Sequence, residues 1–203
     1  FFPKFDKNYW ANNESRKTGE KVEDILKRWA DLGDKARKEG TNLHNQIENF
    51  YNEKEYDNSP ELEKFMRFHE KFIKSNYEPF RSEWRVFDEK KLLAGTIDMV
   101  YKKSNGKVFL FDWKRSKKLI NSKGEVEKDN PFENCLNGLG HMSSTDYNKY
   151  CLQQNIYKYI LEKNYGIKVS SMNLLVLHPY YNNYHIVKVE DLPLETEYLI
   201  ESL

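Results

Sequence analysis

Three charged side chains in the middle of the chain have a spacing that suits catalysis. Asp98 ends the segment Gly95-Thr96-Ile97-Asp98, and Asp112-Trp113-Lys114 follows one hairpin later. Asp112 and Lys114 are two residues apart, so on a strand they point to the same face. Carboxylates suit hard divalent cations such as Mg²⁺ or Mn²⁺, and a lysine beside them can position water and stabilise charge on a phosphate. These residue types therefore indicate metal-assisted phosphodiester hydrolysis.

The turn between the two segments decides whether Asp98 meets Asp112. A two-residue turn would leave the two carboxylates on opposite faces of the hairpin. A three-residue loop pairs Lys103 with Lys107 and holds Gly106 in the left-handed conformation. Asp98 then lies directly opposite Asp112. We predict the three-residue loop, because a slip of one residue would separate the carboxylates.

Hydrophobic periodicity predicts the elements that carry these residues. Alternation predicts strands at 83–87, 93–101, 108–114, 171–178 and 184–189. Helical spacing predicts a helix from 22 that Gly33 interrupts, another from 34 into the low fifties, a third that starts at Ser59-Pro60, and a fourth at about 145–164 that Gly166 ends. Residues 115–145 form a polar segment that is too long for an ordinary connection, so we expect a functional loop. The pattern indicates one α/β domain at 1–203, with a helical lobe at 1–78 and a sheet core at 79–203.

Composition narrows the class of protein. The 203 residues include 33 basic and 32 acidic side chains, 38% hydrophobic and 15% aromatic residues, which is typical of a folded domain. No stretch approaches the roughly 18 to 20 apolar residues of a membrane span, and no signal peptide opens the chain, so we expect no membrane partner and an intracellular location. Cys135 and Cys151 are too few for a disulfide framework or a four-cysteine metal site. Because the chain starts at Phe1, we expect other domains of a longer polypeptide as partners.

Several short motifs, taken in order, resemble the PD-(D/E)xK nuclease superfamily. Glu83, Gly95-x-x-Asp98 and Asp112-x-Lys114 are similar to its signature, with Ile97 where a proline usually stands. Segments 40–48 and 153–157 are similar to the G-T-x-x-H and Q-x-x-x-Y helices of the RecB-like exonuclease branch. That branch includes the mitochondrial genome-maintenance exonuclease and CRISPR adaptation exonucleases. Each motif alone is weak, but together they follow the family's order.

The resemblance implies a restriction-endonuclease-like core, in which helices flank a central mixed sheet. It also implies a DNA-binding deoxyribonuclease that uses one or two Mg²⁺ or Mn²⁺ ions. By this resemblance His44, Asp98 and Asp112 bind metal, together with the main-chain carbonyl of Trp113, and Lys114 is the catalytic lysine. Taken alone, a helical histidine is more often a packed or surface residue than a ligand.

Other residues receive supporting roles from the same resemblance. Glu83 matches the first-strand acid, which we expect behind the metal ligands rather than among them. Gln153 and Tyr157 match residues that contact the DNA backbone or support the lysine, and their spacing places them on one helix face. The four cysteines that hold an iron–sulfur cluster in many relatives are missing here, so we expect no such cluster. The segment between Lys114 and Gln153 is longer than in the minimal version.

A run of basic side chains leaves the expected active site directly. Arg115, Lys117 and Lys118 follow Lys114 in sequence, where they could hold the phosphates of an incoming strand. Charge runs are usually solvated surface, and Asp-x-Lys alone is usually an exposed strand pair. The apolar run Val-Phe-Leu-Phe before Asp112 favours the catalytic interpretation, because it places these charges at the end of a core strand.

The sequence leaves three functions to compare. We expect an exonuclease that acts on single-stranded DNA or duplex ends and leaves 5′-phosphates. The first alternative is a structure-selective endonuclease on the same core, which closed circular DNA would distinguish because an exonuclease needs an end. The second is a catalytically inactive, nuclease-like module that binds nucleic acid. The complete set of catalytic residue types argues against inactivity.

Overall fold

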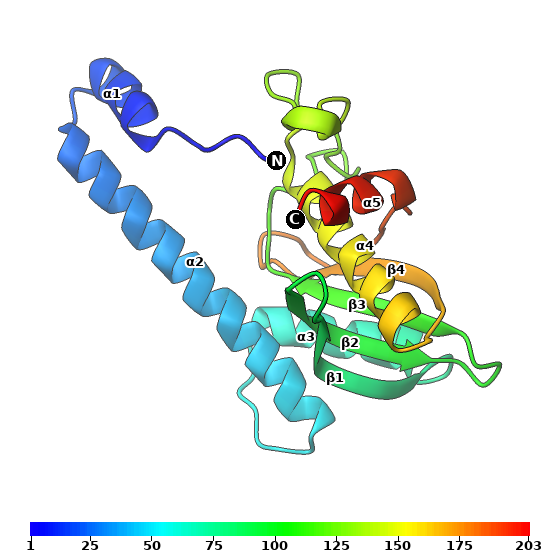
Figure 1. The fold of residues 1–203 in the computed structure, drawn as a ribbon. Helices are drawn as coiled ribbons and strands as arrows, with labels where there is room; N and C mark the ends of the chain where they lie inside the picture. The colour runs from blue at the N-terminus through cyan, green and yellow to red at the C-terminus, as the bar shows by residue number, and fades with distance from the viewer.

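Five strands form a single mixed sheet between the helices of the fold (Figure 1). The computed structural model describes all residues from 1 to 203. The strands lie in the order β1-β2-β3-β4-β5, with bounds Glu78–Asp88, Leu93–Lys102, Val108–Lys114, Val169–Val176 and His185–Lys188. All neighbours are antiparallel except β3 and β4, which are parallel and joined by a crossover through helix α4 (Asp146–Asn164). The predicted α/β class, a mixed sheet flanked by helices, is confirmed.

Helices cover both faces of this sheet and create two apolar cores. On one face α4 packs over a core that includes Ile97, Leu110 and Ile160, and α5 (Pro193–Glu201) packs against α4. The opposite face is covered by the C-terminal half of α2 (Val22–Tyr51), by α3 (Pro60–Phe68) and by a π-helical turn at His69–Ile73. None of the helices combines the length and the apolar character that a membrane crossing requires.

The hairpin between β2 and β3 has the predicted register. Lys102 lies opposite Val108, and the N–H of Lys103 donates to the carbonyl of Lys107 at 2.9 Å. Gly106 has a φ of +79°, the left-handed conformation that the three-residue loop requires. The predicted three-residue loop is therefore confirmed, and with it the predicted register of β2 and β3.

Helix ends follow the sequence signals more closely than helix interiors do. Ser59 caps α3 by accepting from the N–H of Leu62, and Thr145 caps α4 by accepting from Asn148. Gly166, just after α4, has a φ of +65°. The structure adds α5 near the C-terminus, in a region for which we predicted no helix.

The helix break predicted at Gly33 is wrong, because α2 runs unbroken from Val22 to Tyr51. A glycine inside a helix costs only about 1 kcal/mol relative to alanine. Contacts at both ends of α2 outweigh that cost: α1 (Lys7–Thr18) packs on its first turns, and Leu43 and Ile47 are buried near its end.

Replacing Gly33 by alanine should therefore stabilise the protein by about 1 kcal/mol. A β-carbon at this position would meet no atom within 4 Å, so the substitution adds no strain. Urea unfolding of the variant and the wild type would measure the difference. A loss of stability would mean that the helix depends on a bend at this glycine.

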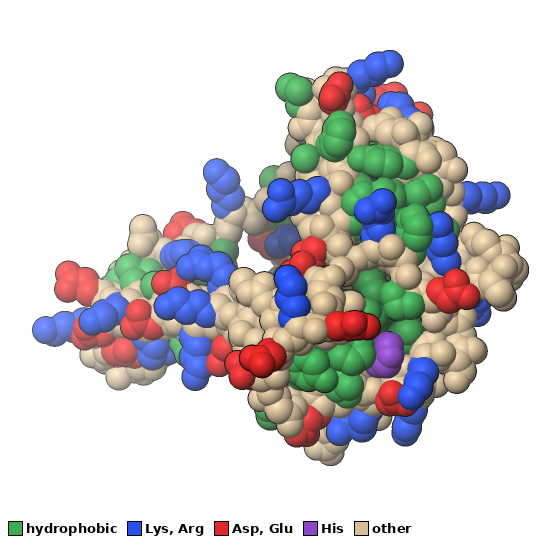
Figure 2. All heavy atoms as spheres, turned by 90° about the horizontal axis from the view of Figure 1, so that it is seen from below, with side chains coloured by type: hydrophobic (Ala, Val, Ile, Leu, Met, Phe, Trp, Pro, Cys, Tyr) green, Lys and Arg blue, Asp and Glu red, His purple; other side chains and the backbone are tan.

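The N-terminal half of α2 and α1 form an arm that projects from the body (Figure 1). Residues 31–38 of α2 are all exposed. The first residues of the chain return to the body, where the N–H of Leu136 donates to the carbonyl of Phe1 at 2.7 Å and the Phe1 ring meets that of Tyr198. The arm is thus attached to the body at both ends. Both basic and acidic side chains lie on its surface (Figure 2).

Candidate metal centre

Three acidic residues stand in a row across three neighbouring strands. Glu83 lies on β1, Asp98 on β2 and Asp112 on β3. Residue pairs on both sides set Glu83 against Asp98, and Asp98 and Asp112 come directly after the last pair of β2 and β3, Met99 with Phe111. Asp98 and Asp112 are buried, and Glu83 is partly exposed. The row therefore brings together carboxylates from residues that are far apart in sequence.

The sheet is irregular at this level. Glu83 has a φ of +45°, a left-handed conformation that residues other than glycine rarely adopt. On β2, Ile97 packs in the core beneath α4 whereas Met99 packs in the opposite core, although residues two apart on a regular strand share a face. The alternation of side chains thus reverses around Asp98. Backbone strain of this kind concentrates at functional sites.

Helix α2 carries His44 to the row of acids. Its imidazole Nε2 lies 3.0 Å from the carbonyl oxygen of Trp113. Its Nδ1 lies 3.5 Å from Asp98 Oδ2 and 3.8 Å from Glu83 Oε1. One ligand atom each from His44, Glu83 and Asp98 all lie within 4.8 Å of one another. This donor set fits a divalent cation, and it places Glu83 beside the expected ligands rather than behind them.

Asp112 is held by two neighbours next to this cluster. Its Oδ2 lies 2.5 Å from Lys114 Nζ, and its Oδ1 accepts a hydrogen bond from the amide of Gln154 at 3.0 Å. The ammonium of Lys114 is the one partner of Oδ2. The ammonium of Lys114 lies 4.3 Å above the ring centroid of Tyr150. The structure therefore pairs the expected catalytic lysine with one carboxylate and fixes that carboxylate from α4.

The buried charged groups of the site shift one another's pKa values. Burial lowers the pKa of His44, but the carboxylates of Asp98 and Glu83 outweigh it and raise the pKa to about 10. Burial and then the charge of Asp98 raise the pKa of Asp112, against the effect of Lys114. Burial lowers the pKa of Lys114, and Asp112 raises it by more. Protonated His44 and Lys114 thus supply the positive charge that three close acids require.

The metal-free protein should lose stability as the pH rises toward 10, because the folded-state pKa of His44 lies above its ordinary value of 6.5. The imidazolium contribution is fully present below pH 6.5 and is lost as the pH rises through about 10. At most this contribution to the free energy of unfolding amounts to roughly 5 kcal/mol. Urea unfolding in chelator from neutral pH to pH 10 should show this loss in the wild type and not in His44→Gln. Parallel curves for the two proteins would contradict it.

The structure also places the two residues predicted on α4. The amide of Gln153 donates to the hydroxyl of Tyr157 at 3.0 Å, so the two side chains share a helix face. The Tyr157 ring packs on Gly95, three residues before Asp98. Sequence reasoning missed Gln154, which is fully buried and holds Asp112. The neighbouring glutamine carried the motif, and spacing alone cannot show which of two adjacent glutamines faces the sheet.

Of the three basic residues after β3, Arg115 forms ion pairs within the protein, and Lys117 and Lys118 form none. The guanidinium of Arg115 is bound by Glu61 at 2.7 Å and by Glu39 at 2.9 Å, and only 12% of the side chain is exposed. Lys117 and Lys118 are exposed and make no ion pair. Arg115 therefore joins α2 and α3 to the body, while the two lysines remain available to a ligand.

Comparison with protein-family models gives no match to this chain, and no curated protein matches it either. The candidate site therefore rests on the residues and geometry described above.

Proposed function

We propose that this protein is a metal-dependent deoxyribonuclease of the PD-(D/E)xK type, on the RecB-like exonuclease branch. The observation that carries the proposal is the arrangement of Glu83, Asp98 and Asp112 across adjoining strands, with Lys114 paired to Asp112 and His44 brought in by α2. Phosphodiester hydrolysis needs positive charge at the phosphate and an activated water, and this combination of residues suits both needs.

The donor atoms fit Mg²⁺ or Mn²⁺. Glu83 and Asp98 supply oxygen donors and His44 a nitrogen donor. Asp112 Oδ2, which the Lys114 ammonium holds at 2.5 Å, is a further candidate. Hard oxygen ligands favour both ions, and the histidine nitrogen favours Mn²⁺ somewhat. A bound ion would polarise the scissile phosphate and lower the pKa of a coordinated water.

The chain's own residues would orient the reactants. Lys114 would hold the attacking water and stabilise the charge that develops on the phosphate. Gln154 would keep Asp112 in place, since its amide fixes one carboxylate oxygen, and Tyr150 would keep the ammonium over its ring. Departure of the 3′-oxygen would leave a 5′-phosphate on the product.

Cleavage of labelled DNA tests the proposal. Linear and closed circular DNA, single- and double-stranded, and a matched linear RNA would be incubated with Mg²⁺, Mn²⁺ or chelator. Metal-dependent trimming of linear DNA alone is the expected result, and the position of the lost label gives the polarity. Cutting of circles would identify an endonuclease instead. Binding without cleavage of any substrate would identify an inactive binding module.

Deleting residues 1–20 should lower exonuclease activity at least tenfold while Mn²⁺ binding changes less. We expect the arm, which is attached to the body at both ends, to thread a single strand past the metal centre, so the strand must enter by a free end. None of the metal-centre side chains lies in the deleted segment. Activity and Mn²⁺ affinity would be measured on the same preparation. Equal losses in both would mean that the segment only supports the fold.

A further inference from the structure

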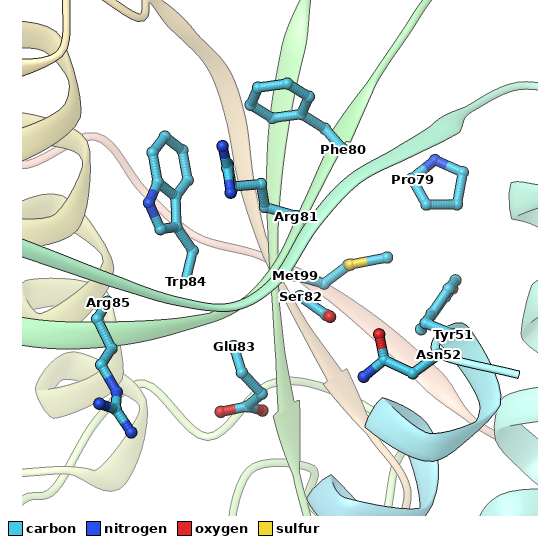
Figure 3. A pocket seen from close by; sticks show the side chains of 10 residues that line it. All are labelled: Tyr51, Asn52, Pro79, Phe80, Arg81, Ser82, Glu83, Trp84, Arg85 and Met99. Atoms are coloured by element: carbon cyan, nitrogen blue, oxygen red, sulfur yellow. The ribbon is translucent and has the colours of Figure 1, made fainter. Parts of the chain in front are cut away.

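A cavity opens along the outer edge of β1, directly beside the acidic row (Figure 3). Its volume is about 580 Å³, and Glu83 belongs both to its wall and to the candidate metal centre. Tyr51 and Asn52, at the end of α2, form the opposite wall. Any molecule in this cavity would therefore lie next to the acids.

Two arginines line the cavity without a partner. Arg81 and Arg85 lie two residues before and after Glu83, and both are exposed. Neither guanidinium makes an ion pair or a side-chain hydrogen bond, in contrast to Arg28, whose guanidinium is held by acids. Glu83 does not neutralise them, because its carboxylate faces His44. The cavity thus presents free positive charge beside a cluster of negative charge.

The aromatic side chains around Arg81 hold its guanidinium in place. It lies over the ring of Trp84 at 5.3 Å and over that of Phe80 at 5.8 Å, between the two rings (Figure 3). Attraction to the two rings leaves the N–H groups of the guanidinium free to bind phosphate oxygens. Figure 3 also places Glu83 and Arg85 on the other side of the strand from Arg81.

We propose that this cavity binds the sugar–phosphate backbone of the substrate strand next to the bond that is cleaved. Arg81 and Arg85 are four residues apart on β1, about 13 Å along a strand, which is too far for both to hold one phosphate. They bind different phosphates of the same strand. This inference rests on the proposed nuclease function and names the part of the site that holds the substrate.

A peptide strand added to β1 is the competing occupant, because β1 is at the edge of the sheet. Three features of β1 disfavour it. Pro79 lacks an N–H, the register shifts between Pro79 and Arg81, and Glu83 has a positive φ. Each interrupts the straight row of hydrogen-bonding groups that strand addition requires, whereas a phosphate backbone needs only the two cations.

Binding of a fluorescent single-stranded oligonucleotide in chelator tests this inference without catalysis. The double variant Arg81→Gln/Arg85→Gln should raise the Kd about tenfold and reduce the slope of log Kd against log salt by about 1.4, the value for two phosphate contacts on a single strand. Arg67→Gln is the matched control: Arg67 is exposed on α3 and contacts only the carbonyl of Asn182. It should bind as the wild type does.

Cleavage kinetics separate the two proposals. With Mg²⁺, the double variant should raise KM about tenfold and change kcat less than twofold. A wild type that cleaves DNA while the double variant keeps its Kd, salt slope and KM would overturn the cavity proposal alone. A wild type that neither binds nor cleaves DNA would overturn both. A labelled β-strand peptide that binds the wild type and is displaced by no oligonucleotide would assign the edge to a protein partner.

Discussion

Replacing Asp112 by asparagine should reduce metal-dependent DNA cleavage about 1,000-fold or more. The change removes a charge that lies opposite Asp98 and 2.5 Å from Lys114, at the centre of the proposed reaction. Loss of one well-placed electrostatic group at a phosphoryl centre typically lowers kcat by two to three orders of magnitude. Weaker metal binding would lower the rate further, because the metal supplies positive charge at the phosphate. Lys114→Met should cause a comparable loss in kcat, measured on end-labelled linear DNA with saturating Mg²⁺.

The control for this prediction is a carboxylate outside the site. Asp191 is 59% exposed and pairs with Lys158, so Asp191→Asn should keep full activity. Breaking a buried ion pair costs about 3 to 5 kcal/mol, so each variant must be assayed well below its own melting temperature. The double variant Asp112→Asn/Lys114→Met leaves neither charge unpaired and checks that low activity is not unfolding. Full cleavage by folded Asp112→Asn and Lys114→Met proteins would contradict the assignment.

Gly95→Ala should destabilise the protein by about 2 to 3 kcal/mol. A β-carbon at Gly95 would lie 2.4 Å from Cε1 of Tyr157, and the tyrosine ring is 7% exposed and tied to Gln153, so it cannot easily move away. Overpacking a core of this kind costs about 1 to 3 kcal/mol. The absence of a side chain at Gly95 thus lets α4 pack against β2 close to Asp98. Urea unfolding would measure the change.

The matched control is Gly33→Ala, which lacks a neighbouring atom and should stabilise the chain instead. A double-mutant cycle with Tyr157→Leu gives a second check, because removing the ring should make the Gly95→Ala change much less costly. Additive losses in that cycle would mean that Tyr157 is not the obstacle. Equal stability of Gly95→Ala and the wild type would show that the ring has room to move.

Local signals in the sequence predicted much of the fold. The turn residues around Gly106 allowed two registers of β2 and β3, and we predicted the three-residue loop because only that loop keeps Asp98 and Asp112 together. Gly106 has the positive φ that this loop requires. The capping residue Ser59 located the start of α3. These features depend on residues close in sequence, where backbone chemistry decides the outcome.

Features that depend on distant partners were not predictable. The continuity of α2 through Gly33 comes from packing at both ends of the helix. The ion pairs of Arg115 are made with Glu39 and Glu61, which lie on two different helices. The role of Gln154 depends on the rotation of α4 against the sheet, and one residue of rotation exchanges it with Gln153.

Glu83 combines both kinds of information. The resemblance to the PD-(D/E)xK signature pointed to it from the sequence. Its positive φ and its position near His44 emerge only when α2 and β1 pack together. The row of acids was therefore foreseeable, while the grouping of Glu83 with His44 and Asp98 was not.

The central claim is that His44, Glu83, Asp98 and Asp112 form one metal centre, and Mn²⁺ binding tests it most directly. Electron paramagnetic resonance would count the free and bound Mn²⁺ for the wild type, Asp98→Asn and the control Asp191→Asn, in the presence of a single-stranded oligonucleotide that resists cleavage. We expect one or two ions on the wild type and the control, and an affinity 10- to 100-fold weaker for Asp98→Asn. Equal affinity of all three proteins, or no binding by the wild type, would contradict the claim.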